Sequence, residues 1–405
     1  MEISACVIAK NESEHIGICL EKLRKYGFEI IVVDTGSTDN TKEIALAYTS
    51  QVYDYPWKDD FASARNFAIS KSSNEYILSI DCDEYIEEMD ADTLKQSILN
   101  HPEEIGRIKI TNIFHQNGIP MENTEWLKRI FSKKTYHFEG KIHEQIVAIN
   151  MHEKGSYDAP IQILHVGYDI SEEKRKIKAI RNIALLQKEL EDQISYFKDK
   201  ESVFYELSKQ QITDSGREMY LNLVEDILYN NNNISEKFQK DTRIPYTLYQ
   251  LGKSYYMAGN NRIAAEYFSC ALCFDLDPKL EYVVDMVQTY GYALINSGQA
   301  EKALAFENIY EEFGNTADFM FLMGLIYMNN AHFENAIDEF QKATAMKEER
   351  IKGVNSYLAN YNIGVIYECL GYIEDAENYY RECGEYKPAK KRLDTIEERK
   401  KQRLV

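Results

Sequence analysis

The stretch "YILSIDCDEYIEE", residues 76–88, decides how the first half of the chain is interpreted. Its apolar run ends in Asp81 and Asp83, with one residue between them. Because side chains alternate along an extended strand, we expect both carboxylates on one face. Adjacent carboxylates repel unless a cation neutralises them or one holds a proton. The stretch therefore predicts a divalent metal shared with a phosphate-bearing ligand, and a turn built from aspartates is the plainer alternative.

Short apolar runs alternate with helical patterns up to about residue 168. Strands are expected at 3–9, 29–34, 51–55 and 76–81, and helices at 13–25, at 37–48 with Ser37 or Asp39 as cap, and at 60–70. Such alternation predicts a parallel sheet with right-handed crossovers. Sheets of this kind bind ligands beyond the carboxyl ends of their strands, where Asp34 and Asp81 stand. From about 106 to 166 the pattern changes to strands and loops.

Beyond residue 170 the pattern is helical. A long helix is expected in "SEEKRKIKAIRNIALLQKELE", and four similar segments follow. They align on Gly252, Gly291, Gly324 and Gly364, and on Ala264, Ala303, Ala336 and Ala376. The pattern resembles the tetratricopeptide repeat, and a weaker copy is expected at 201–228. Each helix pair buries its apolar face only against its neighbours, which predicts a curved stack with a concave groove.

Composition excludes several classes of protein. The chain has 405 residues, more than one core usually holds, and a net charge of −19 that opposes nucleic-acid binding. We expect neither a signal peptide nor a stable membrane insertion, because the apolar stretches are short. The seven cysteines are expected to be thiols in a reducing cytoplasm. Seven of the eight histidines precede residue 170, so we expect the chemistry in the first half.

Polar motifs directly follow the first two expected strands. In "VIAKNES", Asn11 and Glu12 can meet a nucleobase or its ribose. In "VVDTGSTDNT", Asp34 can accept from ribose hydroxyls or a base N–H, and the following helix N-terminus favours anions. Taken singly, each motif is also ordinary turn chemistry.

Together with "DDFASARN" and "SIDCDEYI", these motifs resemble the family 2 glycosyltransferases of the GT-A fold over about residues 3–168. The similarity is greatest to bacterial enzymes that add a tetratricopeptide region, including the S-glycosyltransferases of glycocin bacteriocins (the sublancin type). The resemblance implies an α/β GT-A (nucleotide-diphospho-sugar transferase) domain at 1–168, a linking helix at 169–200 and an all-α tetratricopeptide-repeat solenoid at 201–405.

The resemblance also implies roles for individual residues. Asp81 and Asp83 would form the DxD element that binds Mg²⁺ or Mn²⁺ and the diphosphate of a UDP-sugar. Asp34 would hold the uridine, and Arg65 would contact the diphosphate. His165, at the end of "IQILH", would join the metal ligands, although a lone histidine after an apolar run is as often structural. The alternative for Arg65 is a surface residue that pairs with Asp59 or Asp60.

A catalytic base is expected in "FEGKIHEQI", residues 138–146. An inverting transferase needs a base near the acceptor, because the acceptor must lose a proton. Glu144 matches the acidic residue of the family by position. The family's usual Glu-Asp pair is here His143–Glu144, so His143 stays open as the base, as does a structural role for both. Trp126 would stack on the sugar or the acceptor, or it belongs to the core. Loops at 84–145 would form the sugar pocket.

We therefore expect a cytoplasmic, metal-dependent inverting transferase that moves a sugar from a UDP-sugar to a peptide or protein. Cysteine is the first acceptor by resemblance, and serine or threonine, as on flagellin, comes second. A surface-polysaccharide transferase is a further alternative, and the basic C-terminal stretch would then meet the membrane or simply cap the solenoid. A scaffold without activity is the non-enzymatic reading. A homodimer through the repeats is also expected.

Overall fold

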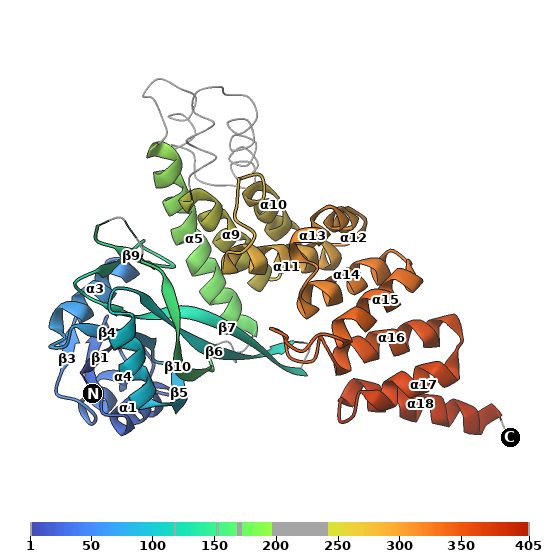
Figure 1. Ribbon diagram of the computed structural model, residues 1–405, viewed down its shortest axis with the longest axis horizontal. Helices are drawn as coiled ribbons and strands as arrows, with labels where there is room; N and C mark the ends of the chain where they lie inside the picture. Colours follow the sequence, from blue (N-terminus) through green and yellow to red (C-terminus); the bar gives the residue numbers. More distant parts are fainter. Residues whose placement is uncertain are drawn as a thin grey trace. The chain divides into compact units, whose positions relative to one another are not determined.

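The computed structural model describes residues 2–116, 119–150, 152, 154–167, 172–196 and 242–403. The chain divides into two compact units, Met1–Lys174 and Arg175–Val405. The first unit is a mixed α/β domain and the second is helical, as expected from the sequence (Figure 1). The weaker repeat copy expected at 201–228 lies outside the described residues.

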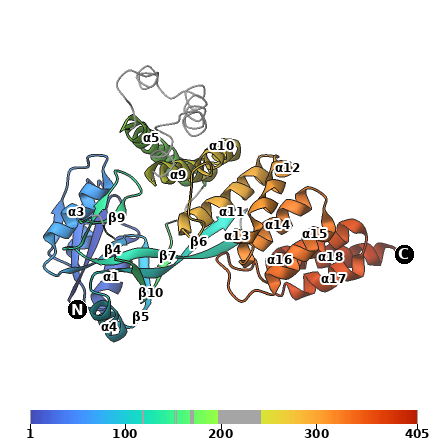
Figure 2. The same ribbon diagram turned by 45° about the horizontal axis from the view of Figure 1, so that its top comes forward.

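The first unit is built on an eight-stranded sheet with the order β3-β2-β1-β4-β7-β6-β10-β5. Its strands are β1 (Ile3–Ala9), β2 (Glu29–Asp34), β3 (Val52–Asp54), β4 (Tyr76–Asp81), β5 (Glu84–Met89), β6 (Ile105–Gln116), β7 (Ile119–Ser132) and β10 (Ser156–His165). Strands β1 to β4 pair in parallel, which confirms the expected arrangement. Strands β6 and β7 form a long antiparallel pair (Figure 2). A separate ribbon joins β8 (Tyr136–Glu139) to β9 (Gln145–Ala148).

Helices cover both faces of this sheet because alternate strand residues point to opposite sides. The helices are α1 (Ile16–Lys25), α2 (Thr41–Leu46), α3 (Phe61–Lys71) and α4 (Ala91–Asn100). Helices α1 and α4 share one apolar core with Val7 and Ile80. Helix α3 packs in a second core with Cys6 and Ile77, and Phe138 of the ribbon lies in that core too.

Two helices begin later than the sequence predicts. Helix α1 begins at Ile16 and not at Ser13, because the preceding residues are bonded to the loop after β2. Helix α2 begins at Thr41. Of its two expected caps, Asp39 accepts from the N–H of Thr41 at 3.0 Å, at the start of the helix, whereas Ser37 accepts from the N–H of Asn11 in the other loop. The stretch 84–145, expected to contribute loops, also holds β5, α4 and β6 to β8.

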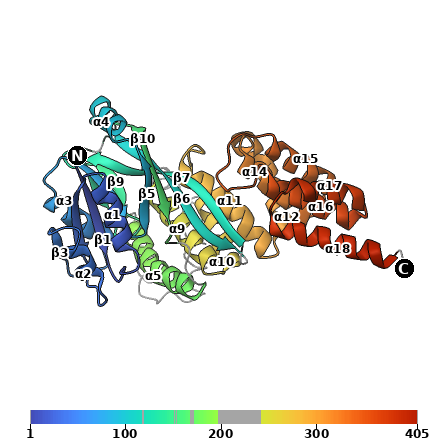
Figure 3. The ribbon, with the colours of Figure 1, turned by 90° about the horizontal axis from the view of Figure 1, so that it is seen from below.

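The second unit is a stack of paired helices (Figure 3). They are α5 (Glu172–Tyr196), α9 (Arg243–Met257), α10 (Asn261–Ala271), α11 (Glu281–Asn296), α12 (Ala300–Ala303), η1 (Leu304–Ile309), α13 (Tyr310–Phe313), α14 (Ala317–Asn329), α15 (Phe333–Thr344), α16 (Tyr357–Leu370), α17 (Ile373–Glu382) and α18 (Lys387–Arg403). The basic C-terminal stretch forms α18, which buries Ala389 and Ile396 against the last repeat. It therefore closes the stack, as the capping alternative predicts. Among the described residues, no helix combines the length and the apolar character that a bilayer span needs.

The repeat glycines allow paired helices to approach closely. A Cβ atom on Gly324 would lie 2.6 Å from the ring of Phe340, and one on Gly364 would lie equally close to Tyr380. Gly252 meets Phe268 in the same way, at 2.5 Å. The repeat alanines are fully buried in the same interfaces. Glycine on one helix and an aromatic ring on the other thus form the recurring contact.

The second repeat departs from this rule. Glu307 stands four residues after Ala303, where the other repeats have an aromatic residue. The outer helix is broken there into α12, the 3₁₀ segment η1 and α13. Gly291 is met instead by Leu322 of the next repeat, 2.7 Å from the position of a Cβ atom. Without a ring to pack on its glycine, this helix pair lacks the contact that holds the others together.

We predict that Gly324→Ala destabilises the helical unit. Alanine favours a helix over glycine by about 0.5–1 kcal/mol, so any loss must come from the collision with Phe340. Overpacking of this kind costs about 1–3 kcal/mol. Urea unfolding followed by circular dichroism would measure it. The double variant Gly324→Ala/Phe340→Leu should recover part of the loss. A gain in stability for the single variant would contradict the packing role of the glycine.

Candidate active site

The carboxyl ends of three parallel strands meet at one edge of the sheet. Asp34, the last residue of β2, is in register with Ala9 of β1. Asp81, the last residue of β4, is in register with Ile8 on the other side of β1. The two acidic residues that the sequence analysis placed at this edge therefore flank the same strand, and the loop after β1 runs between them.

That loop is tied to the loop after β2. Asn11 has a φ of 57°, and its N–H donates to Ser37 Oγ at 2.9 Å. Its side-chain oxygen accepts from the N–H of Thr38 at 2.7 Å. The N–H of Glu12 donates to Thr41 Oγ1 at 2.8 Å. Asn11, proposed to touch a base or ribose, thus fixes the shape of this edge, and a ligand contact by either residue stays a prediction.

Asp34 offers one oxygen that the fold does not use. Its carboxylate is buried, and Oδ1 accepts from the N–H groups of Gly36 and Ser37, both at 2.9 Å. In the part of the chain that the structure describes, Oδ2 is buried and has no hydrogen-bond partner. An acceptor of this kind is costly unless something donates to it. A ribose hydroxyl or base N–H fits this position.

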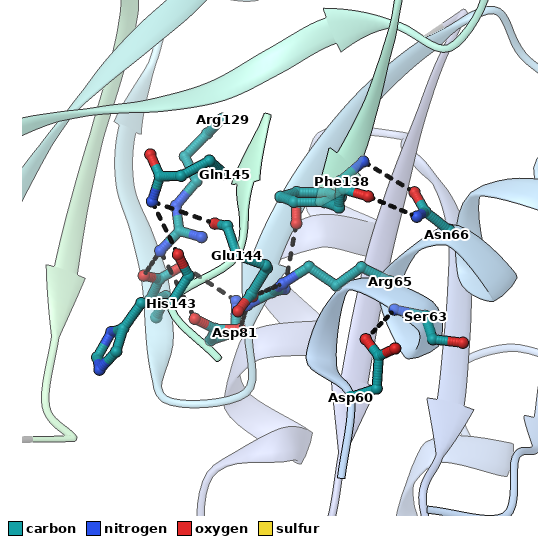
Figure 4. A network of polar contacts seen from close by, with 12 residues as sticks. Asp60, Ser63, Arg65, Asn66, Asp81, Arg129, Phe138, His143, Glu144 and Gln145 are labelled. Carbon is teal, nitrogen blue, oxygen red and sulfur yellow. Dashed lines mark hydrogen bonds and ion pairs between the residues drawn. The ribbon is translucent and has the colours of Figure 1, made fainter. Parts of the chain in front are cut away.

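Arg65 joins two carboxylates from distant parts of the sequence. It lies on α3 and is buried. Its Nη2 donates to Asp81 Oδ1 at 2.8 Å, its Nη1 to Ser79 Oγ at 3.2 Å, and its Nε to Glu144 Oε1. Figure 4 shows Asp81 and Glu144 both beside the guanidinium of Arg65. Each of its three nitrogens therefore donates to a protein group, so Arg65 holds both carboxylates in place.

The surface alternative for Arg65 is wrong. Asp60 caps α3 by accepting from the N–H of Ser63 at 2.8 Å (Figure 4). Asp59 accepts from the indole N–H of Trp57 at 2.8 Å. Both neighbouring carboxylates therefore have local partners, and the arginine points into the interior.

Sequence reasoning missed a second arginine, Arg129, whose side chain is 14% exposed. It lies on β7 where the pairing with β6 shifts register, a bulge that redirects a side chain. Its Nη2 lies 2.5 Å from Glu84 Oε1 and 3.6 Å from Asp81 Oδ2. The N–H of Asp81 donates to Glu84 Oε2 at 3.0 Å, which closes the network. The sequence signal that could have pointed to Arg129 is its charge next to the apolar Ile130, which the structure buries.

Charge in this network is distributed unevenly. Burial disfavours the ionised form of Asp81, but the positive charges of Arg65 and Arg129 outweigh it and hold its pKa well below the usual range. Burial raises the pKa of Glu84 above its ordinary value despite Arg129. The two arginines thus keep Asp81 ionised at neutral pH.

Asp83 lies outside β4, because the strand ends at Asp81 and the chain turns at Cys82 and Asp83 before β5. The strand alternation used to predict a shared face therefore does not extend to Asp83, and the shared face stays a prediction. Asp83 Oδ2 lies 3.5 Å from His165 Nε2. The other ring nitrogen of His165 is fixed by the side-chain oxygen of Asn112, at 2.7 Å. His165 and Asp83 are therefore together, as predicted for metal ligands.

Gly167 lies directly against these two side chains. A Cβ atom on it would lie 1.9 Å from Asp83 Oδ2 and 2.7 Å from His165 Nε2. Only a residue without a side chain therefore fits here, and Asp83 and His165 are the pair that would hold a metal ion. Within the described ranges, no group of three or more His, Cys, Asp or Glu side chains converges on one point. A metal here would take its remaining ligands from substrate phosphates and water, and Asp81 as a ligand stays a prediction.

The two candidate bases point in different directions. Glu144 is buried and turned toward Arg65, whereas the ring of His143 points away from it (Figure 4). His143 has a φ of 51°, a left-handed conformation, and its carbonyl accepts from Gln145 Nε2 at 2.9 Å. Only Glu144 joins the network that also holds Asp81. Which of the two is the base stays a prediction.

Trp126 lies apart from these side chains. It pairs with Lys109 across β6 and β7, and the guanidinium of Arg107 lies 5.9 Å from its ring. Its neighbour Glu125 accepts from Asn112, the partner of His165. Alternation along β7 then puts Trp126 on the opposite face. The structure therefore does not bring it to the metal candidates, and its contact with sugar or acceptor stays a prediction.

Comparison with known proteins agrees with this arrangement. Residues 4–157 match the glycosyl transferase family 2 model, and residues 317–350 and 357–390 match tetratricopeptide repeats. The chain thus carries a family 2 glycosyl transferase domain of GT-A type, followed by tetratricopeptide repeats. Both parts of the predicted fold are confirmed.

Individual relatives match over part of their length. The glycosyltransferase SunS of Bacillus subtilis is 30% identical over 197 residues, 46% of this chain and 45% of that protein. A TPR repeat-containing protein of Synechococcus elongatus is 30% identical over 176 residues, 41% and 42% of the two chains. The chain thus spans less than half the length of these relatives. A structure of S. aureus TarS residues 1–349 with UDP-GlcNAc is 14% identical, covering 86% of this chain and 93% of that one, with a TM-score of 0.30, too low to establish a shared fold.

We predict that Gly167→Ala weakens metal binding, because the added methyl group would collide with the side chains of Asp83 and His165 and displace them. Electron paramagnetic resonance of Mn²⁺, with and without UDP, would measure binding. Gly17→Ala on α1, whose added Cβ would lie no closer than 3.3 Å to its nearest neighbour, Ile44, is the matched control. Unchanged Mn²⁺ binding by Gly167→Ala would show that Asp83 and His165 do not hold the metal.

We predict that Arg65→Met lowers the free energy of unfolding by about 3 kcal/mol, because it removes the buried cation with which both Asp81 and Glu144 are paired. The control is Lys42→Met, which removes the exposed pair with Asp54 and should change stability little. Urea titration at neutral pH measures both. Equal, small effects of the two variants would show that Arg65 is not a structural anchor.

Proposed function

We propose that the chain is a metal-dependent inverting glycosyltransferase, with its transferase domain over residues 1–168, that moves a sugar from a UDP-sugar to a peptide or protein side chain. One observation carries the proposal. The side chains of Asp83 and His165, two candidate metal ligands, lie together at the sheet edge where Asp34 holds a buried, unused acceptor oxygen. The first feature suits a diphosphate with its metal and the second suits a nucleoside.

At the donor, the bond between the anomeric carbon and the diphosphate oxygen breaks and UDP leaves with the electron pair. A bound Mg²⁺ or Mn²⁺ would stabilise the charge that develops on the diphosphate. Asp83 and His165 would hold that ion, with Asp81 as a further candidate ligand. Asp34 would orient the nucleoside through its free oxygen. Arg65 keeps Asp81 in place and, with Arg129, ionised.

At the acceptor, a thiol or hydroxyl forms the new bond to the anomeric carbon from the opposite face and loses its proton. We assign the proton acceptor to Glu144, because Arg65 fixes its carboxylate in the network that contains Asp81. His143 is the alternative, and a neutral imidazole would suffice for a thiol, which ionises readily. Cysteine is the favoured acceptor, and serine or threonine, or a surface polysaccharide, is the second choice.

The helical repeats support a polypeptide acceptor, because stacks of this kind present grooves that bind peptides. The similarity to SunS, itself named a glycosyltransferase, supports transfer of a sugar. We also propose a cytoplasmic location and a homodimer through the repeats, both as the sequence predicts.

The test is hydrolysis of UDP-glucose, UDP-N-acetylglucosamine and UDP-galactose by the full chain with Mn²⁺, Mg²⁺ or EDTA. We expect metal-dependent turnover of one donor. Asp83→Ala should abolish it, whereas Asp54→Ala, at an exposed pair, should not change it. Turnover that resists EDTA would overturn metal dependence. Absence of both turnover and donor binding would favour the alternative that the chain is a scaffold without enzymatic activity.

Once a donor and an acceptor are known, the two candidate bases can be separated. Glu144→Gln should reduce transfer by about 10²–10⁴-fold, the usual contribution of a general base. His143→Gln should retain most of it. The reverse pattern would assign the base to His143.

A further inference from the structure

The helical unit contains a pocket of about 260 Å³, remote in sequence from the candidate active site. It opens between α11 and the link from α13 to α14. This is the place where the second repeat departs from the others, because Glu307 replaces the aromatic residue and the outer helix breaks into short pieces. The pocket therefore accompanies a feature specific to this repeat.

One side chain that lines the pocket carries a buried hydrogen-bond donor that lacks an acceptor among the described residues. Gln288 of α11 is 6% exposed and lines the pocket. Its amide nitrogen is buried and finds no acceptor in the described ranges of the chain. Buried donors without a partner are rare in folded proteins, since each forfeits its hydrogen bonds to water. The position in a pocket indicates that the missing acceptor belongs to a ligand.

The remaining walls define the chemistry of that ligand. Val284, Phe313 and Phe319 supply apolar surface. The lining includes one cation, Lys279, and one anion, Glu312, so the pocket has no single sign of charge to select a phosphate or an ammonium group. Pockets for drug-sized ligands run about 300–1,000 Å³, and this one is smaller. It suits one apolar side chain next to a carbonyl oxygen.

We propose that this pocket binds a peptide through one apolar side chain, with a neighbouring backbone carbonyl accepting from the Gln288 amide. An apolar side chain next to a backbone carbonyl occurs wherever a peptide contains an apolar residue. The peptide backbone is neutral, which suits a lining that carries one positive and one negative side chain. The binding site does not depend on sugar transfer. Only the identification of the peptide as the acceptor substrate rests on the proposed function.

The test uses the full chain without nucleotide sugar or metal. Saturation-transfer NMR compares the N-acetyl N-methylamides of phenylalanine, leucine and glycine, with phenyl phosphate as a charged probe. We expect signals from the phenylalanine and leucine probes only. Equal signals from the glycine probe would overturn the proposal. A stronger signal from phenyl phosphate would replace the peptide by an anionic ligand.

Two variants locate the signal. Asn315→Trp places a bulky ring at an exposed residue of the lining, and it should abolish binding. Glu311→Trp, exposed and outside the lining, should leave binding intact. Binding that survives Asn315→Trp would show that the probes bind elsewhere.

Gln288→Leu separates a binding role from a structural one. Leucine keeps the volume and removes the buried donor, so thermal stability should not fall, while binding should weaken by up to about tenfold. A fall in stability with unchanged binding would show that the Gln288 amide stabilises the fold and does not bind the ligand. Since these assays need no sugar donor, failure of the transferase proposal leaves their outcome unaffected.

Discussion

The buried guanidinium of Arg65 is the interaction on which the first unit depends. It links α3, the end of β4 and the loop before β9 through Asp81, Ser79 and Glu144. Without this cation, the carboxylates of Asp81 and Glu144 would lose the buried partner that they share, and breaking such ion pairs is costly. The same bonds set the distance between Asp81, the first residue of the predicted DxD element, and Glu144, the candidate base. Structural stability and site geometry therefore rest on one side chain.

The second unit is held together differently, by repetition of a short contact. Gly252, Gly324 and Gly364 each admit an aromatic ring from the paired helix. Each contact is local, so the stack needs no residue that reaches across many repeats. The α/β unit concentrates its constraints on a few charged groups, whereas the helical unit spreads them evenly. This difference agrees with the concentration of histidines and of the DxD element in the first half of the chain.

The sequence predicted the parts of the fold that follow from periodicity. Strands β1 to β4, the helices between them and the repeats were all visible in apolar spacing. The features that the sequence could not predict depend on turns, bulges and contacts between distant residues. The turn at Cys82 and Asp83 ends the strand, so the alternation of side chains stops before Asp83. Arg129 reaches Asp81 through a bulge, which leaves no regular pattern. Arg65 was identified as functional, but its pairing with Glu144, 79 positions away, required the tertiary structure.

The replacement of a ring by Glu307 also affects how the helical stack responds to force and heat. In a linear array, cooperativity passes from one repeat to the next through their shared interfaces. A repeat whose outer helix is partly 3₁₀ transmits less of it, because short 3₁₀ segments have poorer hydrogen-bond geometry. The second repeat is thus a natural boundary between two folding segments. Amide hydrogens there would exchange through local opening while those on either side remain protected.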